Sequence, residues 1–191
     1  MNKIKLGLRL FAITGIFLIS NACNGGENNK IVVDHDNTDN TDKITKAICV
    51  MTPTEGSEVK GLITFTQTDG GILIEADIEG LSEGNHGFHI HEWGDISKSD
   101  GTAAGGHFNP DDADHAGPGD AVRHAGDLGN ITADSDGKAH YNQVDSLISF
   151  TGKHNIIGRS VIIHVGEDDL VSQPTGDAGG RVAQGVIGVA Q

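Results

Sequence analysis

Positive charge and cysteine are both scarce in this sequence. Its 13 lysines and arginines face 27 aspartates and glutamates, which gives a formal net charge of -14 at pH 7. Such an acidic protein repels nucleic acid and anions in general, so any anionic substrate has to be attracted by a local positive group. The only cysteines are Cys23 and Cys49, and the apolar stretch 47–51 around Cys49 favours a buried structural thiol.

No apolar segment near the N-terminus is long enough to cross a bilayer. The run at 10–19 follows three basic residues and precedes small ones, which predicts a secretory signal peptide over residues 1–22. Cleavage before Cys23 would suit a lipoprotein, anchored by lipid on the periplasmic side of a bacterial membrane or at the cell surface. The alternative is a soluble periplasmic protein cut at the same bond. A lipidated Cys23 would leave no partner for a disulfide within the chain.

Aromatic residues are also few, at 4%, whereas glycine is abundant at 28 residues and Val, Ile and Thr recur in short runs. This composition is typical of short strands joined by turns and predicts an all-β fold. Residues 23–45 are rich in Asn, Asp, Gly and Thr and are predicted to be a flexible tether before one domain at 46–191. About eight antiparallel strands are expected in a sandwich or barrel, at 48–51, 59–67, 72–79, 86–92, 127–133, 139–145, 160–164 and 185–190.

Two long segments interrupt the strands, at 94–125 and 166–180, and loops of this length in a compact domain need a reason. The first loop carries His107, His115 and His124, and metal ligation would order it. With Asp127, these three histidines match a closed tetrahedral zinc site.

A second group of histidines lies on predicted strands. His89 and His91 are two residues apart, so a strand places both imidazoles on one face, where they can reach one metal or remain exposed polar residues. His164 ends another strand. Six histidines and one aspartate give seven ligands, whereas two four-coordinate metals need eight, so one histidine would bridge. An all-imidazole site with an open position suits copper.

Four stretches carry a resemblance to a known family: 87–95, 106–110, 123–130 and 185–191. They resemble the copper/zinc superoxide dismutases, and the match runs in order from about Lys46 to Gln191. The resemblance implies an eight-stranded antiparallel Greek-key barrel or sandwich, immunoglobulin-like, with two long functional loops. It also implies copper and zinc as cofactors and superoxide as substrate, with antioxidant defence outside the cytoplasm as the role.

The resemblance also assigns individual residues. Asp168 would link a ligand of each metal, and Arg181 would be the positive group that binds superoxide beside the copper. His107 would take up a proton in one half of a two-stroke redox cycle and return it in the other. His86 matches a structural histidine of the family, whereas His35, His140 and His154 are expected to face solvent. The implied copper ligands are His89, His91, His107 and His164, and the implied zinc ligands are His107, His115, His124 and Asp127.

The sequence departs from the family in two places. Gly101 and Gln184 stand where the family has a disulfide, which leaves the placement of Arg181 open and predicts a stronger dependence of stability on metal. The loop between Leu170 and Arg181 is short and lacks the charged guidance residues of eukaryotic members, so slower turnover is expected.

Two further expectations concern assembly and an alternative function. Trp93 and the segments 156–159 and 187–189 resemble the dimer contacts of eukaryotic members, which predicts a homodimer, although ordinary packing at the barrel end explains these residues equally well. The missing disulfide favours a copper-binding or copper-handling protein as the alternative. The full zinc set, Arg181 and the lack of a paired-cysteine motif favour the enzyme.

Overall fold

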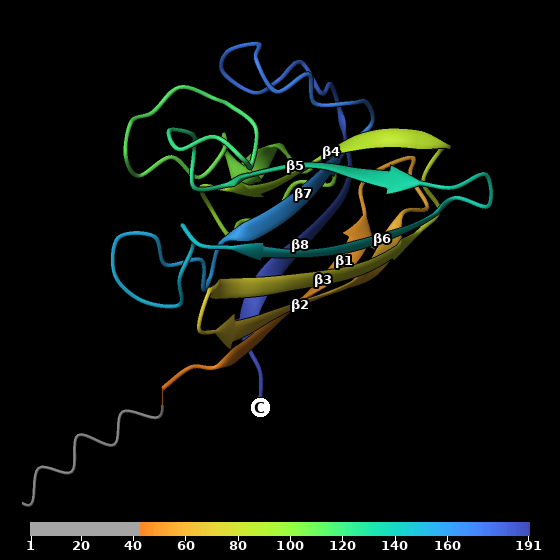
Figure 1. The fold of residues 1–191 in the computed structure, drawn as a ribbon. Coiled ribbons are helices and arrows are strands. Elements are labelled where there is room, and N and C mark those ends of the chain that lie inside the picture. The colour runs from red at the N-terminus through yellow and green to blue at the C-terminus, as the bar shows by residue number, and fades with distance from the viewer. Residues whose placement is uncertain (1–42) are drawn as a thin grey trace, which may run out of the picture. The chain divides into compact units, whose positions relative to one another are not determined.

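The computed structural model describes residues 43–191 of the chain. This part contains eight strands and one short helix, joined by loops (Figure 1). The predicted signal peptide, Cys23, His35 and nearly all of the predicted tether lie outside these residues. No helix in the described part is long and apolar enough to cross a membrane. The elements are β1 (Lys46–Pro53), β2 (Lys60–Thr68), β3 (Gly71–Glu79), β4 (Gly84–His91), the 3-10 helix η1 (Thr102–Ala104), β5 (Asp127–Ala133), β6 (Lys138–Asp145), β7 (Ser160–His164) and β8 (Arg181–Val189).

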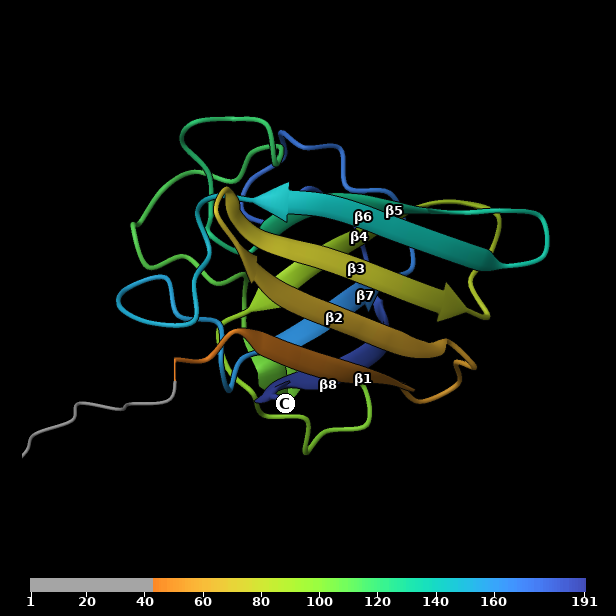
Figure 2. The ribbon, with the colours of Figure 1, turned by 60° about the horizontal axis from the view of Figure 1, so that its bottom comes forward.

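The strands close into an antiparallel barrel in the order β1-β2-β3-β6-β5-β4-β7-β8. The connections from β3 to β4 and from β6 to β7 join strands that are not neighbours, whereas the other connections join adjacent strands (Figure 2). This pattern is a Greek key, and it confirms the fold class predicted from the sequence.

Alternation of side chains along the strands builds the core. On β3, Ile72, Ile74 and Ala76 are fully buried, whereas the residues between them remain partly exposed. Cys49 on β1 is fully buried too, and burial raises the pKa of its thiol to about 12, so it is an inert core residue. The expectation of a buried thiol at this position is confirmed.

Strand β4 is covered on both of its faces. Phe88 and Ile90 point into the core, while His89 and His91 point to the opposite face and are nonetheless buried. Figure 1 shows the loops 92–126 and 165–180 gathered beside β4, β5 and β7. These two loops therefore exclude water from a strand face that would otherwise be at the surface.

Strand β8 begins at Arg181, earlier than the sequence analysis placed it. The polar side chains of Arg181 and Gln184 hide the strand pattern, but their backbones pair with β7, and Gln184 also pairs with β1. Two residues of the expected dimer segments, Ile156 and Ile187, are buried within the chain itself and cannot contact a second copy.

Candidate metal centre and anion site

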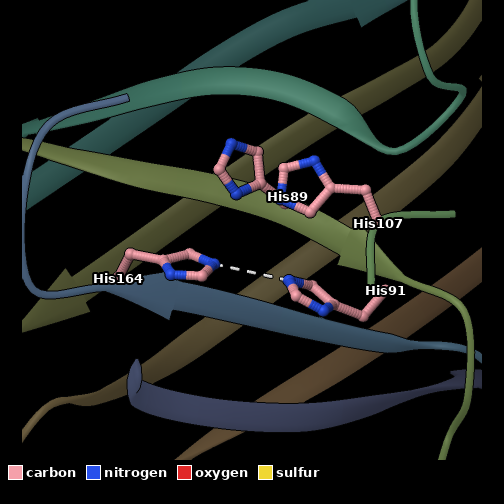
Figure 3. Close-up of side chains that lie close together, drawn as sticks. All are labelled: His89, His91, His107 and His164. Atoms are coloured by element: carbon pink, nitrogen blue, oxygen red, sulfur yellow. Dashed lines mark hydrogen bonds between the residues drawn. The ribbon is translucent and has the colours of Figure 1, made fainter. Parts of the chain in front are cut away.

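Strands and a loop together bring four imidazoles face to face. His89 and His91 lie on β4, His164 is the last residue of β7, and His107 comes from the loop 92–126 through an isolated bridge to His91. One ligand atom from each lies within 4.8 Å of the others, and all four residues are buried. Figure 3 shows the rings of His89 and His107 on one side and those of His91 and His164 on the other.

The backbone fixes the tautomers of His91 and His164. Nδ1 of His91 donates to the carbonyl of Gly105 at 3.0 Å, and Nδ1 of His164 donates to the carbonyl of Gly179 at 3.1 Å. Both Nε2 atoms then carry lone pairs, and they face each other at 3.4 Å. Two buried lone pairs at this distance repel each other unless a cation lies between them.

His89 and His107 each keep one ring nitrogen without a protein partner. Nε2 of His89 contacts Asp168 Oδ2 at 2.7 Å, and Nδ1 of His107 contacts Asp127 Oδ1 at 2.8 Å. The remaining atoms, Nδ1 of His89 and Nε2 of His107, are buried and have no hydrogen bond. Buried polar atoms are rarely left unpaired, so these two nitrogens indicate a site that binds a cation.

A second cluster surrounds a single carboxylate oxygen. Oδ1 of Asp127 lies 2.8, 3.0 and 3.2 Å from the Nδ1 atoms of His107, His115 and His124. The other oxygen, Oδ2, accepts the backbone N–H groups of His124 at 2.9 Å and Ala116 at 3.2 Å. The backbone thus aims Oδ1 at the three rings, and the four side chains form a second buried group of potential metal ligands.

Asp168 connects the two clusters. Its Oδ2 contacts Nε2 of His89, and its Oδ1 contacts Nε2 of His115 at 2.9 Å. Asn130 holds Asp168 in turn, because its side-chain amide exchanges two hydrogen bonds of 2.8 Å with the Asp168 backbone. Only glycine fits at position 176, since a Cβ there would lie 1.8 Å from Asp168 Oδ1.

Burial keeps the imidazoles of the first cluster neutral. Together with the adjacent His89 ring, it lowers the pKa of His107 to about 4 and that of His164 to about 3. Burial also lowers the pKa of His91 well below its usual value. Burial would raise the pKa of Asp127, but hydrogen bonds from His107 and His124 outweigh it and lower that pKa. At neutral pH the first cluster therefore offers neutral nitrogens and Asp127 offers a carboxylate, the forms that bind metal.

Arg181 lies at the edge of the first cluster, on the start of β8, where it pairs with His164. Its guanidinium donates from Nη1 to the carbonyl of Gly101 and from Nη2 to that of Gly105 at 2.6 Å. Gly105 therefore accepts hydrogen bonds from both His91 and Arg181. The sequence left open how Arg181 is placed without a disulfide, and these two carbonyls answer the question.

The two donor sets differ in chemistry. Four imidazole nitrogens suit copper, whereas three imidazoles with one carboxylate suit a closed zinc site. The unpaired nitrogens of His89 and His107 show that the residues fit such ions. Sequence reasoning named every side chain in these clusters, and the structure brings all of them together.

Comparison with known proteins agrees with this geometry. The family model described as "Copper/zinc superoxide dismutase (SODC)" matches residues 59–187. The chain is 49% identical to the extracellular superoxide dismutase [Cu-Zn] of Drosophila melanogaster over 143 residues, 71% of this chain and 78% of that protein. It is 47% identical to superoxide dismutase [Cu-Zn] A of Xenopus laevis over 152 residues, 76% of this chain and 98% of that protein.

The chain belongs to the copper/zinc superoxide dismutase family. A copper/zinc superoxide dismutase converts superoxide to oxygen and hydrogen peroxide with copper and zinc as cofactors, and this chain is such an enzyme. A solved structure of the clock protein EA4 matches with a TM-score of 0.71 and 44% identity, covering 78% of this chain and 96% of that one.

The histidines outside the two clusters behave differently from one another in this superoxide dismutase. His86 is buried and holds the backbone, because Nδ1 donates to the carbonyl of His164 at 2.8 Å, while Nε2 lies 3.2 Å from the Ser82 hydroxyl, which can donate to it. His140 faces solvent as expected. The side chain of His154 is only 26% exposed, because Nε2 contacts Asp111 at 2.6 Å.

Sequence reasoning missed several residues that shape the superoxide dismutase site. The carbonyls of Gly105 and Gly179 fix two tautomers, yet a backbone oxygen leaves no signature in a sequence. Asn130 and Gly176 act through Asp168. Asn130 lies in one of the stretches that resemble the family, which is the only signal that could have pointed to it.

Proposed function

We propose that the first cluster binds the copper and the second binds the zinc of this enzyme, with His107 shared between them. The chemistry of the donor sets supports the assignment, as does the position of His107, whose Nδ1 faces Asp127 while Nε2 faces the first cluster. The proposed copper ligands are His89, His91, His107 and His164, and the proposed zinc ligands are His107, His115, His124 and Asp127.

One observation carries this proposal. Nε2 of His107 is buried, has no protein partner and belongs to a residue that lies in both ligand groups. A ring that has a carboxylate beside one nitrogen and no protein partner at the other is suited to bridging two cations.

The residues of the chain divide the work of the reaction. Copper, when bound, supplies the one-electron oxidation and reduction of superoxide. Arg181 attracts the anion and orients it, and its two carbonyl partners keep the guanidinium beside the cluster. Nε2 of His107 takes up a proton in one half-reaction and gives it back in the other. The loops that cover β4 bury His89 and His91 and thereby keep water away from these ligands.

The test is superoxide decay catalysed by the purified protein, with copper and zinc quantified on the same sample. We expect rapid decay at one copper and one zinc per chain. His107→Ala should keep the fold but lose the spectroscopic interaction between the two metals, measured with cobalt in place of zinc. Full activity of His107→Ala would contradict the bridge.

We also propose that the enzyme is exported and anchored through Cys23. The signal-like segment 1–22 and the extracellular relative in Drosophila melanogaster support export. The tether 23–45 would then hold the domain 46–191 away from the membrane. Labelled palmitate should be incorporated into the wild-type protein and not into Cys23→Ala. An unlabelled wild type would favour the soluble periplasmic form, and a labelled Cys23→Ala protein would show that the lipid is attached elsewhere.

A homodimer is the third proposal. Two of the residues expected at the dimer contact, Val189 and Trp93, are exposed apolar residues, with 57% and 56% of their surfaces in contact with solvent. Sedimentation should show a dimer for the wild type and a monomer for the double variant Val189→Lys/Trp93→Lys. Val144→Lys, on β6 and similarly exposed at 52%, is the matched control and should remain dimeric. A monomeric wild type would contradict the proposal.

A further inference from the structure

The segment 92–106 is held against β8 by side chains of β8. Arg181 donates to the carbonyls of Gly101 and Gly105, on either side of η1. Three residues further along β8, Gln184 reaches the same segment. Its Nε2 donates to the carbonyl of Lys98 at 3.2 Å, and its side chain is almost completely buried.

A short chain of hydrogen bonds connects Gln184 with Arg181. The carbonyl of Lys98 also accepts the N–H of Gly101 at 3.1 Å, which closes the turn 98–101. The carbonyl of that same Gly101 accepts Nη1 of Arg181. Gln184 therefore holds one end of a turn whose other end holds the guanidinium.

The oxygen of the Gln184 side-chain amide shows that the amide is not there for stability alone. Oε1 is buried and has no hydrogen-bond partner among the described residues. A buried unpaired acceptor destabilises the fold, and an apolar side chain of the same length would avoid that cost. We therefore attribute the presence of an amide here to the hydrogen bond that its Nε2 donates to the carbonyl of Lys98.

We propose that Gln184 is a positioning residue of the enzyme, which keeps the turn 98–101 closed so that Gly101 holds Arg181 beside the copper ligands. This inference rests on the proposed role of Arg181. A second tie exists, since Ser99 exchanges hydrogen bonds of 2.8 and 2.9 Å with Glu55. The side-chain part of that tie is exposed and competes with water, so it supports the turn less than the buried amide does.

The test compares Gln184→Met with the wild type as metal-loaded full-length protein. Methionine keeps the length and removes both amide ends. Losing one hydrogen bond should speed hydrogen exchange of the Gly101 amide about fivefold, while exchange in β3 stays unchanged. Azide, a small anion that binds copper(II) and changes its visible absorption, should bind about threefold to fivefold more weakly. The melting temperature should stay the same or rise, because the unpaired oxygen is gone.

Thr52→Val is the matched control, because Thr52 donates to the backbone carbonyl of Gln184 at 3.0 Å without touching the turn. It should leave both Gly101 exchange and azide binding unchanged. Unchanged azide binding in Gln184→Met, or an equal loss in Thr52→Val, would overturn the proposal.

Arg181→Ala separates this inference from the proposed function. If Arg181→Ala weakens azide binding and Gln184→Met does not, only the positioning role of Gln184 is wrong. If neither variant changes azide binding, the role of Arg181 itself is wrong, and the inference falls with it.

Discussion

The two ligand clusters are built from different kinds of structure. Three of the four residues of the first cluster lie on the paired strands β4 and β7, and hydrogen bonds of the sheet fix their backbones. In the second cluster, His107, His115 and His124 all come from the loop 92–126, and only Asp127 begins a strand. The barrel can therefore preform the first cluster, whereas we expect the second to need a bound metal to hold its loop in place.

Removing both metals should have the largest effect of the changes considered, and it should act on the second cluster more than on the first. Structural zinc can contribute about 10 kcal/mol to folding, so we expect the melting temperature to fall by at least about 10 °C. Hydrogen exchange should accelerate in residues 107–126 and change little in β4. A melting temperature that barely moves would show that the loop is held without metal.

Ile74→Ala tests the barrel alone. Ile74 is fully buried on β3, so the substitution should lower the free energy of unfolding by about 2–5 kcal/mol. The loss should be the same with and without metals, measured by urea denaturation, and the metal content should not change. Val144→Ala, which alters an exposed residue, should cost less than about 0.5 kcal/mol. A loss confined to the metal-bound form would break the separation of barrel and loops.

Gly176→Ala tests the connection between the clusters. A Cβ at position 176 would collide with Asp168, and the backbone there has a φ of +67°, which disfavours alanine. Displacing Asp168 should lower metal affinity or activity about 10- to 100-fold. Gly119→Ala is the control in the other loop, because nothing lies within 4 Å of its added Cβ. Equal activity in both variants would show that Asp168 is dispensable.

A thiol reductant should have the smallest effect. Cys49 is the only cysteine among residues 43–191, and hydrogen bonds rather than a disulfide hold the segment 92–106 to β8. We expect dithiothreitol to leave both the superoxide decay rate and the melting temperature of the metal-loaded enzyme unchanged, with metal content checked afterwards. A loss of activity at constant metal content would contradict this arrangement.

The sequence predicted the parts of the fold that depend on side-chain alternation. Strand β3 follows the predicted pattern because its inward face is apolar and its outward face is not. Strand β8 was placed too late because Arg181 and Gln184 interrupt the apolar pattern, and the burial of Gln184 depends on the segment 92–106 that covers it. Ile156 was linked to a dimer because the sequence does not distinguish a buried isoleucine from an exposed one.

The ligand side chains could be named from the sequence because metal chemistry restricts them to a few residue types. Their orientation could not. The tautomers of His91 and His164 depend on the carbonyls of Gly105 and Gly179, and the place of these atoms follows from loop geometry rather than residue identity.

One oxygen atom, the carbonyl of Gly105, has a consequence for how this enzyme can change over generations. It accepts hydrogen bonds from both His91 and Arg181. A Cβ on residue 105 would lie 2.8 Å from Trp93. Any mutation that moves this oxygen should displace both His91, a proposed copper ligand, and Arg181, the proposed superoxide-binding group. We therefore expect substitutions around Gly105 to be tolerated only where the rest of the segment 92–106 changes to keep this carbonyl in place.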